Sequence, residues 1–218
     1  MKITFRILLV ACIAVLGYLC VKSIMDPIKF EQEKTKRESA IIRRLINIRK
    51  AQIEYRNMNG QYTASFDTLI DFVKNGKLKV VLKEGVLSDM QLADGLTDAK
   101  VMKMSEKERI AKGLENFRRD TTLVSVRDSL FGAGYTVDSM RFVPGTRTQF
   151  EMASAELPTA SGLTVKVFEA KTTYDVYLGD LDRQEVINLK DRAKKLEKFA
   201  GLQVGSINEA NNNAGNWE

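Results

Sequence analysis

Acidic side chains occur in close pairs at three places in the chain, and paired carboxylates are able to do chemistry. Two neighbouring carboxylates serve glycoside hydrolysis or calcium binding in many proteins. Each pair here, however, lies at the expected start of a helix, where acids cap the helix or stabilise its positive end. We therefore interpret all three pairs as structural: Asp67 with Asp71, Glu106 with Glu108, and Asp180 with Asp182.

The chain contains no histidine. Histidine is the commonest general base and metal ligand, and without it a Ser-His-Asp triad is impossible. The segment Gly132-Ala-Gly134 lacks the strand-GxGxxG-helix context of a phosphate-binding loop. A serine–lysine pair is the one nucleophilic arrangement that spacing leaves open. We expect no enzyme activity, no cofactor and no metal.

Positive charge is concentrated near the N-terminus. The chain has 34 basic and 28 acidic residues, a net charge of +6. Lys2, Arg6 and Lys22 border an apolar segment, and residues 29–56 hold nine basic and four acidic residues, which leaves the remainder close to neutral. A basic segment beside a membrane favours anionic lipid, whereas nucleic-acid binding calls for a basic face on the domain itself. We predict no nucleic-acid partner.

The apolar segment from Ile3 to Met25 is interrupted only by Arg6 and Lys22. It is long enough to span a bilayer, because both charged side chains can reach the interface. The residues that follow contain no small-residue cleavage site of the A-x-A kind. A retained anchor that contacts the lipid bilayer is therefore the favoured interpretation. A cleaved signal peptide and a lipoprotein signal around Cys12 are the alternatives.

The charges on the two sides of the apolar segment bear on its orientation in the membrane. Lys2, Arg6 and the α-amino group favour a cytoplasmic N-terminus, although the segment after the anchor is also basic. Long domains cross the membrane regardless of their charge. We expect a bacterial inner-membrane protein with its head on the periplasmic side.

Helical periodicity resumes after Pro27, which we expect to be a hinge that either begins a new helix or kinks a continuous one. Apolar side chains recur at spacings of three, four and seven residues, and Asn59-Gly60 is a helix stop signal. Packing on the chain's own head and packing against partner helices are both open, and the first is the commoner use of such a stripe. The candidate packing or partner face consists of Ile41, Ile42, Leu45, Ile46, Ile48, Gln52, Ile53 and Tyr55.

The remaining pattern predicts an α+β head. We expect helices at 66–74, 105–117 and 182–199, and strands at 77–83, 121–126, 139–143, 149–155, 164–169 and 173–178, the last two forming a hairpin. The polar, low-complexity C-terminal segment favours disorder. The predicted parts are a transmembrane anchor at 1–26, an amphipathic stalk helix at 27–60, a soluble head at 61–207 and a disordered tail at 208–218.

The segment from Ile41 to Thr63 resembles the type IV pilins and the pseudopilins of type II secretion. The matching residues are Pro27, Ala51-Gln52, Tyr55, Asn59-Gly60 and Tyr62. The resemblance covers about the first 75 residues and implies a pilin-like fold with an antiparallel β head. The chain departs from the family where Lys22 stands at the position of its glutamate, so we do not expect prepilin processing.

From this resemblance and the apolar face of the stalk helix we expect a structural or assembly subunit of a secretion, pilus or motility machine. Such a subunit acts through helix packing and head contacts. Its partners would be other membrane or envelope proteins, further copies of the chain among them. The alternative is a membrane-tethered extracytoplasmic module that binds a ligand or the cell wall.

Overall fold

The computed structural model describes residues 2–158 and 162–218. Residue 1 of the predicted anchor and residues 159–161 of the predicted head lie outside this description. The chain divides into two compact units. Unit 1 consists of Met1–Ile70 and Thr136–Glu218, and unit 2 is the intervening segment Asp71–Tyr135. Helices and antiparallel sheets together confirm the α+β prediction.

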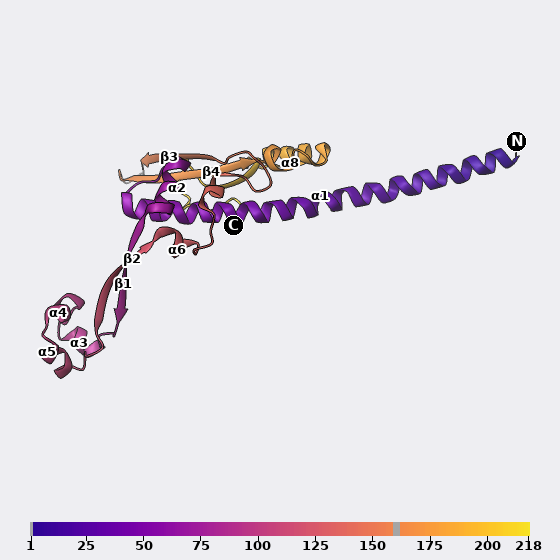
Figure 1. The fold of residues 1–218 in the computed structure, drawn as a ribbon. Helices are drawn as coiled ribbons and strands as arrows, with labels where there is room; N and C mark the ends of the chain where they lie inside the picture. The colour runs from indigo at the N-terminus through magenta and orange to yellow at the C-terminus, as the bar shows by residue number, and fades with distance from the viewer. Residues whose placement is uncertain (1, 159–161) are drawn as a thin grey trace. The chain divides into compact units, whose positions relative to one another are not determined.

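One helix, α1, runs from Lys2 to Asn59 (Figure 1). It continues through Pro27, although proline has no N–H to bond the carbonyl of Ser23. Pro27 thus lies inside one helix and does not begin a second one. The helix ends at the predicted stop, where Gly60 has a φ of +72° and its N–H donates to the Arg56 carbonyl over 2.8 Å.

The two parts of α1 have opposite surroundings. Before Phe30 every side chain that the structure describes is exposed, and this is the one helix among the described residues that is long and apolar enough to cross a membrane. From Phe30 onward one stripe of the helix is buried in unit 1. The environment of the helix therefore changes from exposed to partly buried at Phe30, while the helix itself continues without a break.

A three-stranded antiparallel sheet forms the centre of unit 1. Its order is β3 (Glu151–Pro158), β4 (Thr164–Thr173) and β5 (Gly201–Gly205), and α1 packs against β4 and β5. On β4 the side chains of Phe168 and Ala170 are completely buried, as Val204 is on β5. The short helix η1 (Val137–Arg141) also contacts α1.

Two strand predictions are wrong in unit 1. Residues 139–143 fall mainly in η1, and residues 174–178 form a helical turn, α7 (Tyr174–Leu178). The apolar and aromatic residues at 174–178 fit a strand as well as a helical turn. In α7 the rings of Tyr174 and Tyr177 lie 5.9 Å from each other, one helical turn apart. The predicted hairpin of 164–178 therefore does not form, and β4 pairs instead with β3 and β5.

The prediction of a disordered C-terminal segment is also wrong. Residues 208–218 lie along β5, where Val204 bridges Gly215 and the Gly205 N–H donates to Ala214 over 2.9 Å. The Asn216 side chain accepts from the Gln203 N–H and donates to the Gly201 carbonyl. Backbone groups at 214–216, together with the Asn216 amide, thus pair with β5 in a segment whose composition suggested disorder.

Helix α8 (Arg183–Lys195) completes unit 1 and begins as predicted. The Asp182 carboxylate accepts from the backbone N–H groups of Gln184 and Glu185 at 2.9 and 3.1 Å. Such capping satisfies donors that the first turn of a helix leaves unpaired. Val186 and Ala193 are its buried residues.

Unit 2 is built on a two-stranded antiparallel ribbon, β1 (Lys77–Glu84) and β2 (Arg118–Ser125). Between these strands lie α3 (Asp89–Ala93), α4 (Asp98–Lys103) and α5 (Glu106–Ala111), and α6 (Val126–Leu130) follows β2. The predicted capping box of Ser105 and Glu108 is confirmed, but α5 ends earlier than predicted. A small core between β1 and β2 in the sequence consists of Val101 from α4 and of Leu87, Leu96, Leu114 and Phe117 from the connecting segments.

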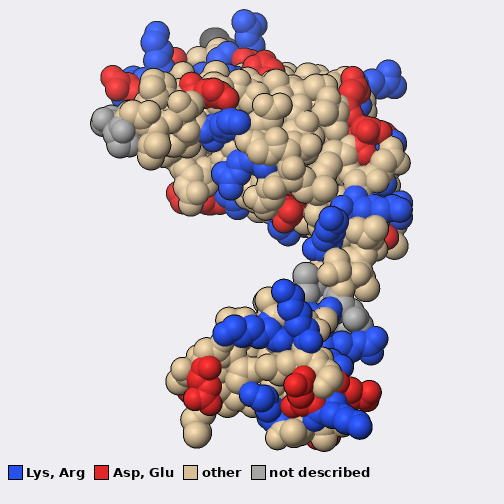
Figure 2. Space-filling model, turned by 90° about the vertical axis from the view of Figure 1, so that its left-hand side faces the viewer, with Lys and Arg blue, Asp and Glu red and all other residues tan. Residues whose placement is uncertain are grey.

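Helix α2 (Phe66–Asn75) carries the chain from unit 1 into unit 2. The Ser65 hydroxyl accepts from the Thr68 N–H at its start, as the sequence predicts. In Figure 2, acidic and basic side chains are interspersed on the visible face of each unit.

Replacement of Leu45 by Ala should destabilise unit 1 by about 2–5 kcal/mol, because the fully buried side chain would leave a cavity. Leu196→Ala is the matched control, since Leu196 is 59% exposed in the same unit and its truncation should change stability by less than about 0.5 kcal/mol. Denaturant unfolding of the full chain in detergent, followed by circular dichroism, measures both. Equal stabilities for the two variants would contradict this account of the core.

Candidate functional site: the junction of helix and head

The predicted packing or partner face divides into two sets. Ile41, Leu45, Ile48 and Gln52 are fully buried inside unit 1. They pack on the chain's own head and do not form a surface for partners. The second set keeps part of its surface exposed and remains a predicted partner face: Ile42, Ile46, Ile53 and Tyr55.

Gln52 fastens the loop that follows α1. Its amide nitrogen donates to the Thr63 carbonyl over 2.6 Å, and its amide oxygen accepts from the Thr63 N–H at 3.2 Å. Burying an amide is costly unless both of its groups are bonded. Gln52 therefore acts as a clamp for the chain reversal after the helix, a role that periodicity alone did not suggest.

Tyr62 anchors the same loop to the sheet and to the C-terminal segment. Its ring lies 4.9 Å from the ring of Phe168, and its hydroxyl accepts from Arg56 and Asn213, each at 3.0 Å. Two of the residues that carried the pilin resemblance, Gln52 and Tyr62, thus tie the end of α1 to the head.

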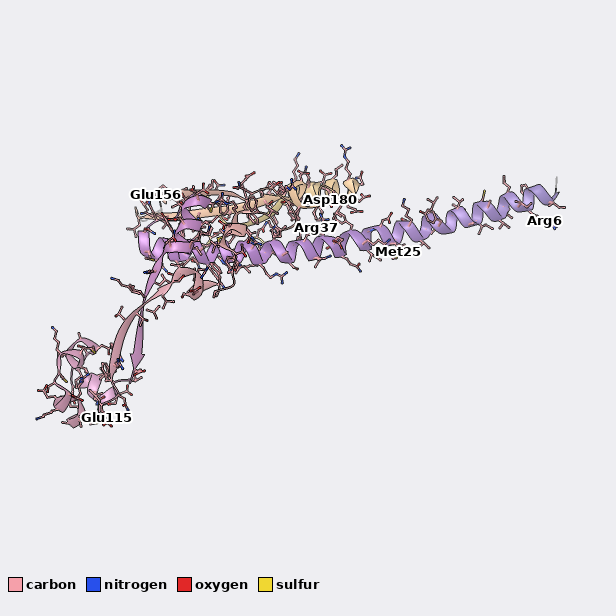
Figure 3. All side chains as sticks on the ribbon, in the orientation of Figure 1. Arg6, Met25, Arg37, Glu115, Glu156 and Asp180 are labelled. Atoms are coloured by element: carbon pink, nitrogen blue, oxygen red, sulfur yellow. The ribbon has the colours of Figure 1, made fainter. Side chains whose placement is uncertain are left out.

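Arg37 joins α1 to the turn after α7. Its guanidinium pairs with both carboxylate oxygens of Asp180 and donates to the Tyr177 carbonyl over 2.7 Å (Figure 3). The Arg37 guanidinium lowers the pKa of Asp180, and Asp180 in turn raises the pKa of Arg37. A forked pair of this kind fixes orientation as well as distance.

Glu38, the next residue, faces the same part of the head. Burial raises the pKa of Glu38, although Lys34 and the Tyr177 hydroxyl both favour its charged form. Tyr177 is itself buried, and its hydroxyl donates to the Glu38 carboxylate over 3.1 Å. Burial, together with the Glu38 charge, raises the pKa of Tyr177.

A cavity of about 320 Å³ lies between α1 and α8. The part of α1 that borders it begins at Pro27, directly after the exposed apolar segment. Its lining residues are Pro27, Ile28, Phe30 and Glu31 of α1 and Glu185, Asn188, Leu189 and Arg192 of α8.

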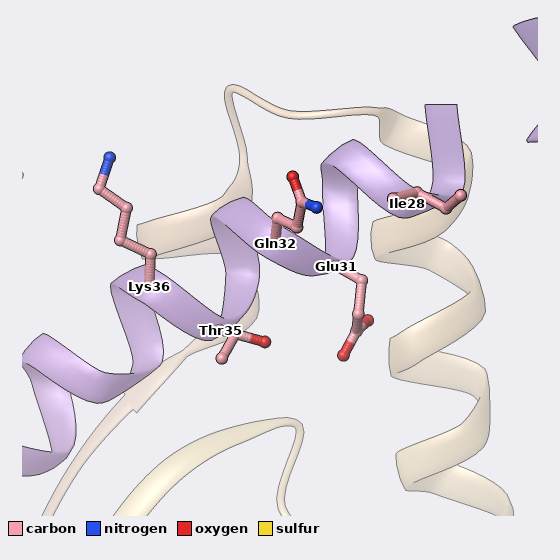
Figure 4. Close-up of a pocket in the computed structure, with 5 residues that line it drawn as sticks. All are labelled: Ile28, Glu31, Gln32, Thr35 and Lys36. Carbon is pink, nitrogen blue, oxygen red and sulfur yellow. The ribbon is translucent and has the colours of Figure 1, made fainter. Parts of the chain in front are cut away.

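Other hollows are less enclosed or lie elsewhere in unit 1. Figure 4 shows a hollow of about 520 Å³ beside Ile28 and Lys36, whose five lining residues all belong to α1, so it is an open surface. Two cavities of about 240 and 200 Å³ border Tyr62. The smaller one is also lined by Arg56, Lys166 and the asparagines at 211–213.

The acidic pairs singled out in the sequence mostly have structural partners. Asp67 pairs with Arg141, and Asp71 accepts from Asn75 over 2.7 Å. Glu108 caps α5, Asp182 caps α8, and Asp180 pairs with Arg37. Among the residues that the structure describes, no three histidine, cysteine or acidic side chains lie together as a metal site.

No protein-family model, curated protein or solved structure matches this chain. The junction itself is therefore the basis for assigning a role to the protein.

Glu38→Gln should change the pH dependence of stability. A carboxyl whose pKa is higher in the folded state than in the unfolded state contributes stability that declines as pH rises through this range. Gln keeps an acceptor for Tyr177 without the buried charge, so the variant should gain stability over the unmodified protein as pH rises above the ordinary pKa range of a glutamate, and should keep this gain at neutral pH. Thermal unfolding at a series of pH values measures the difference.

Asp180→Asn is the matched comparison, because the pKa of the Asp180 carboxyl is lowered whereas that of Glu38 is raised. The stability that the charged Asp180 carboxylate contributes is present at neutral pH and is lost as pH falls. Asp180→Asn should therefore lose most stability, relative to the unmodified protein, at pH 7. The loss should stay below about 1 kcal/mol, since this carboxylate is largely exposed. Parallel pH profiles for the two variants would contradict the assignment.

Proposed function

We propose that this protein is a single-pass, membrane-anchored structural or assembly subunit of a bacterial envelope machine, similar in design to a pseudopilin. Its head would stand on the periplasmic side of the inner membrane. The observation that carries the proposal is the continuity of α1 from its exposed apolar part into the core of unit 1.

The apolar part has the dimensions of an anchor. Ile3 to Met25 comprises 23 residues, or about 34 Å of helix, and a hydrocarbon core is about 30 Å thick. The large apolar side chains in it are between 42% and 74% exposed. A bilayer would cover this surface, which water would not solvate well.

The rigid connection suggests a positioning role. Gln52, Arg37 and Phe30 attach the same helix to the head at three levels, and no flexible linker separates anchor from head. A head that only captured ligands would not require such a stiff mount. A subunit in an assembly benefits from it, because contacts made by the head are then fixed relative to the bilayer.

Unit 2 supplies surface suited to protein contacts. Val86 and Met90 are 89% and 80% exposed, and Ile110 is 55% exposed. Exposed apolar side chains mark a partner surface where they form one contiguous patch. These three side chains are therefore the candidates in unit 2 for contacts with a partner.

A membrane-tethered binding module is the second candidate function. The cavities beside Tyr62 favour it, because one of them combines an aromatic ring with Arg56, Lys166 and three asparagines. Asn212 and Asn213 hold a left-handed conformation there, with φ of 54° and 60°. Polar, aromatic-lined hollows of this kind suit small polar ligands.

Val15→Arg should reduce membrane insertion, because a charge near the middle of the anchor costs about 2.5–3.5 kcal/mol. Ile24→Arg is the control, since an arginine near the end of the same segment can reach the interface. The measurement is the fraction of full-length protein that stays in the membrane pellet after alkaline extraction. Release of the unmodified protein by this extraction would overturn the anchoring proposal.

Mild cross-linking in intact cells tests the assembly role. Unmodified protein should give adducts of defined larger mass, and Ile46→Asp should lower their yield severalfold while the head still unfolds at the same temperature. Ile48→Asp should instead unfold the head, since Ile48 is fully buried. A lone monomer after cross-linking would count against assembly and favour the binding module.

A further inference from the structure

We propose that the cavity between α1 and α8 binds the headgroup of a phospholipid that carries both a phosphate and a primary ammonium group, as phosphatidylethanolamine does. The proposal rests on the proposed function insofar as α1 must cross a bilayer. It goes beyond that function by assigning a specific lipid site to the protein.

The height of the cavity along α1 is the first support. The lining residues of α1 start two residues after Met25, the last residue of the apolar segment, and extend to Glu31. At 1.5 Å per residue they lie about 3–9 Å beyond the hydrocarbon edge. The polar headgroup layer on each side of a bilayer is roughly 5–8 Å thick. Because the helix is continuous, the cavity opens at the level of lipid phosphates.

The charges lining the cavity are the second support. Arg192 can bind a phosphate, for which a planar guanidinium is well suited. Glu185 lies two turns away on the same face of α8, about 10 Å along the helix, and can accept from an ammonium group. Neither side chain has a hydrogen-bond or ion-pair partner within the part of the chain that the structure describes. Both therefore remain available to a ligand.

The balance of charge favours a zwitterion over an anion. Besides Glu185, the cavity is lined by Glu31, whose carboxylate lies 2.7 Å from the Lys34 ammonium. A lipid with a phosphate alone would meet one guanidinium and a nearby unpaired carboxylate. A lipid with a phosphate and an ammonium would satisfy both charges at once.

The apolar lining matches the remainder of such a lipid. Phe30 is only 6% exposed, and Ile28, Leu189 and Pro27 complete an apolar wall beside the charged groups. A volume of about 320 Å³ is at the lower end of the range for small-molecule sites. It suits a headgroup with the start of its acyl chains and is small for a whole lipid.

The test uses the full-length protein in nanodiscs that contain equal amounts of phosphatidylethanolamine, phosphatidylglycerol and phosphatidylcholine. After gentle release into detergent, native mass spectrometry measures which lipids stay bound. We expect phosphatidylethanolamine to be retained about tenfold over the other two. Arg192→Gln and Glu185→Gln should each abolish most of this preference, and Arg192→Lys should restore part of it.

Matched controls separate the site from general charge and folding effects. Arg183→Gln and Asp191→Asn change charges on the same helix outside the lining of this cavity, and both should keep the preference. Unchanged thermal unfolding of Arg192→Gln shows that any loss is not caused by misfolding. Equal retention of the three lipids by the unmodified protein, or the same preference in Arg192→Gln, would overturn the proposal.

The outcome also distinguishes this proposal from the membrane anchor on which it rests. A protein that does not enter nanodiscs at all contradicts the anchoring itself. A protein that enters them but retains no lipid selectively contradicts only the headgroup site.

Discussion

Burial of one stripe of α1 against β4 and β5 is the interaction on which unit 1 depends. The sheet has three strands, and one side of it would be open to water without the helix. Ile41, Leu45 and Ile48 have no exposed surface, so the helix supplies a central part of the hydrophobic core. The same element that would enter the membrane therefore also holds the head together. The exposed apolar part and the buried stripe thus belong to one continuous helix.

Polar contacts give this apolar packing its register. A hydrophobic stripe alone could slide by one helical turn with little loss of buried area. Gln52 prevents this at one end, where its amide nitrogen donates to the Met152 sulfur of β3, and Arg37 does so further along through Asp180 and the Tyr177 carbonyl. Hydrogen bonds are directional, so they fix the position of α1 along its own axis, which non-directional dispersion contacts do not. The position of the head along the helix is thus well defined.

Local signals in the sequence predicted the parts of the structure that depend on near neighbours. The stop at Gly60, the caps at Ser65, Ser105 and Asp182, and the 3.6-residue stripe all arise within a few residues of one another. The strand assignment at 173–178 was wrong because a short apolar run fits either period, and tertiary packing decides between them. The order of residues 208–218 was missed for a related reason. The bonds that hold this segment run to β5 from the Asn216 side chain and from the backbone at 214–216, and β5 has no strong pattern of its own.

The pairing of α1 with β5 has a consequence for how the protein is made. The buried stripe of α1 leaves the ribosome early, but its partners at Gly201–Gly205 follow about 150 residues later. At about 5–20 residues per second this delay is roughly 8–30 seconds. During that time the cover that β5 gives to α1 is missing, although the apolar part of the helix is already complete. Synthesis therefore passes through a stage in which the apolar part of α1 is complete while the core of unit 1 still lacks β5, and the stripe of α1 needs shielding until that strand emerges.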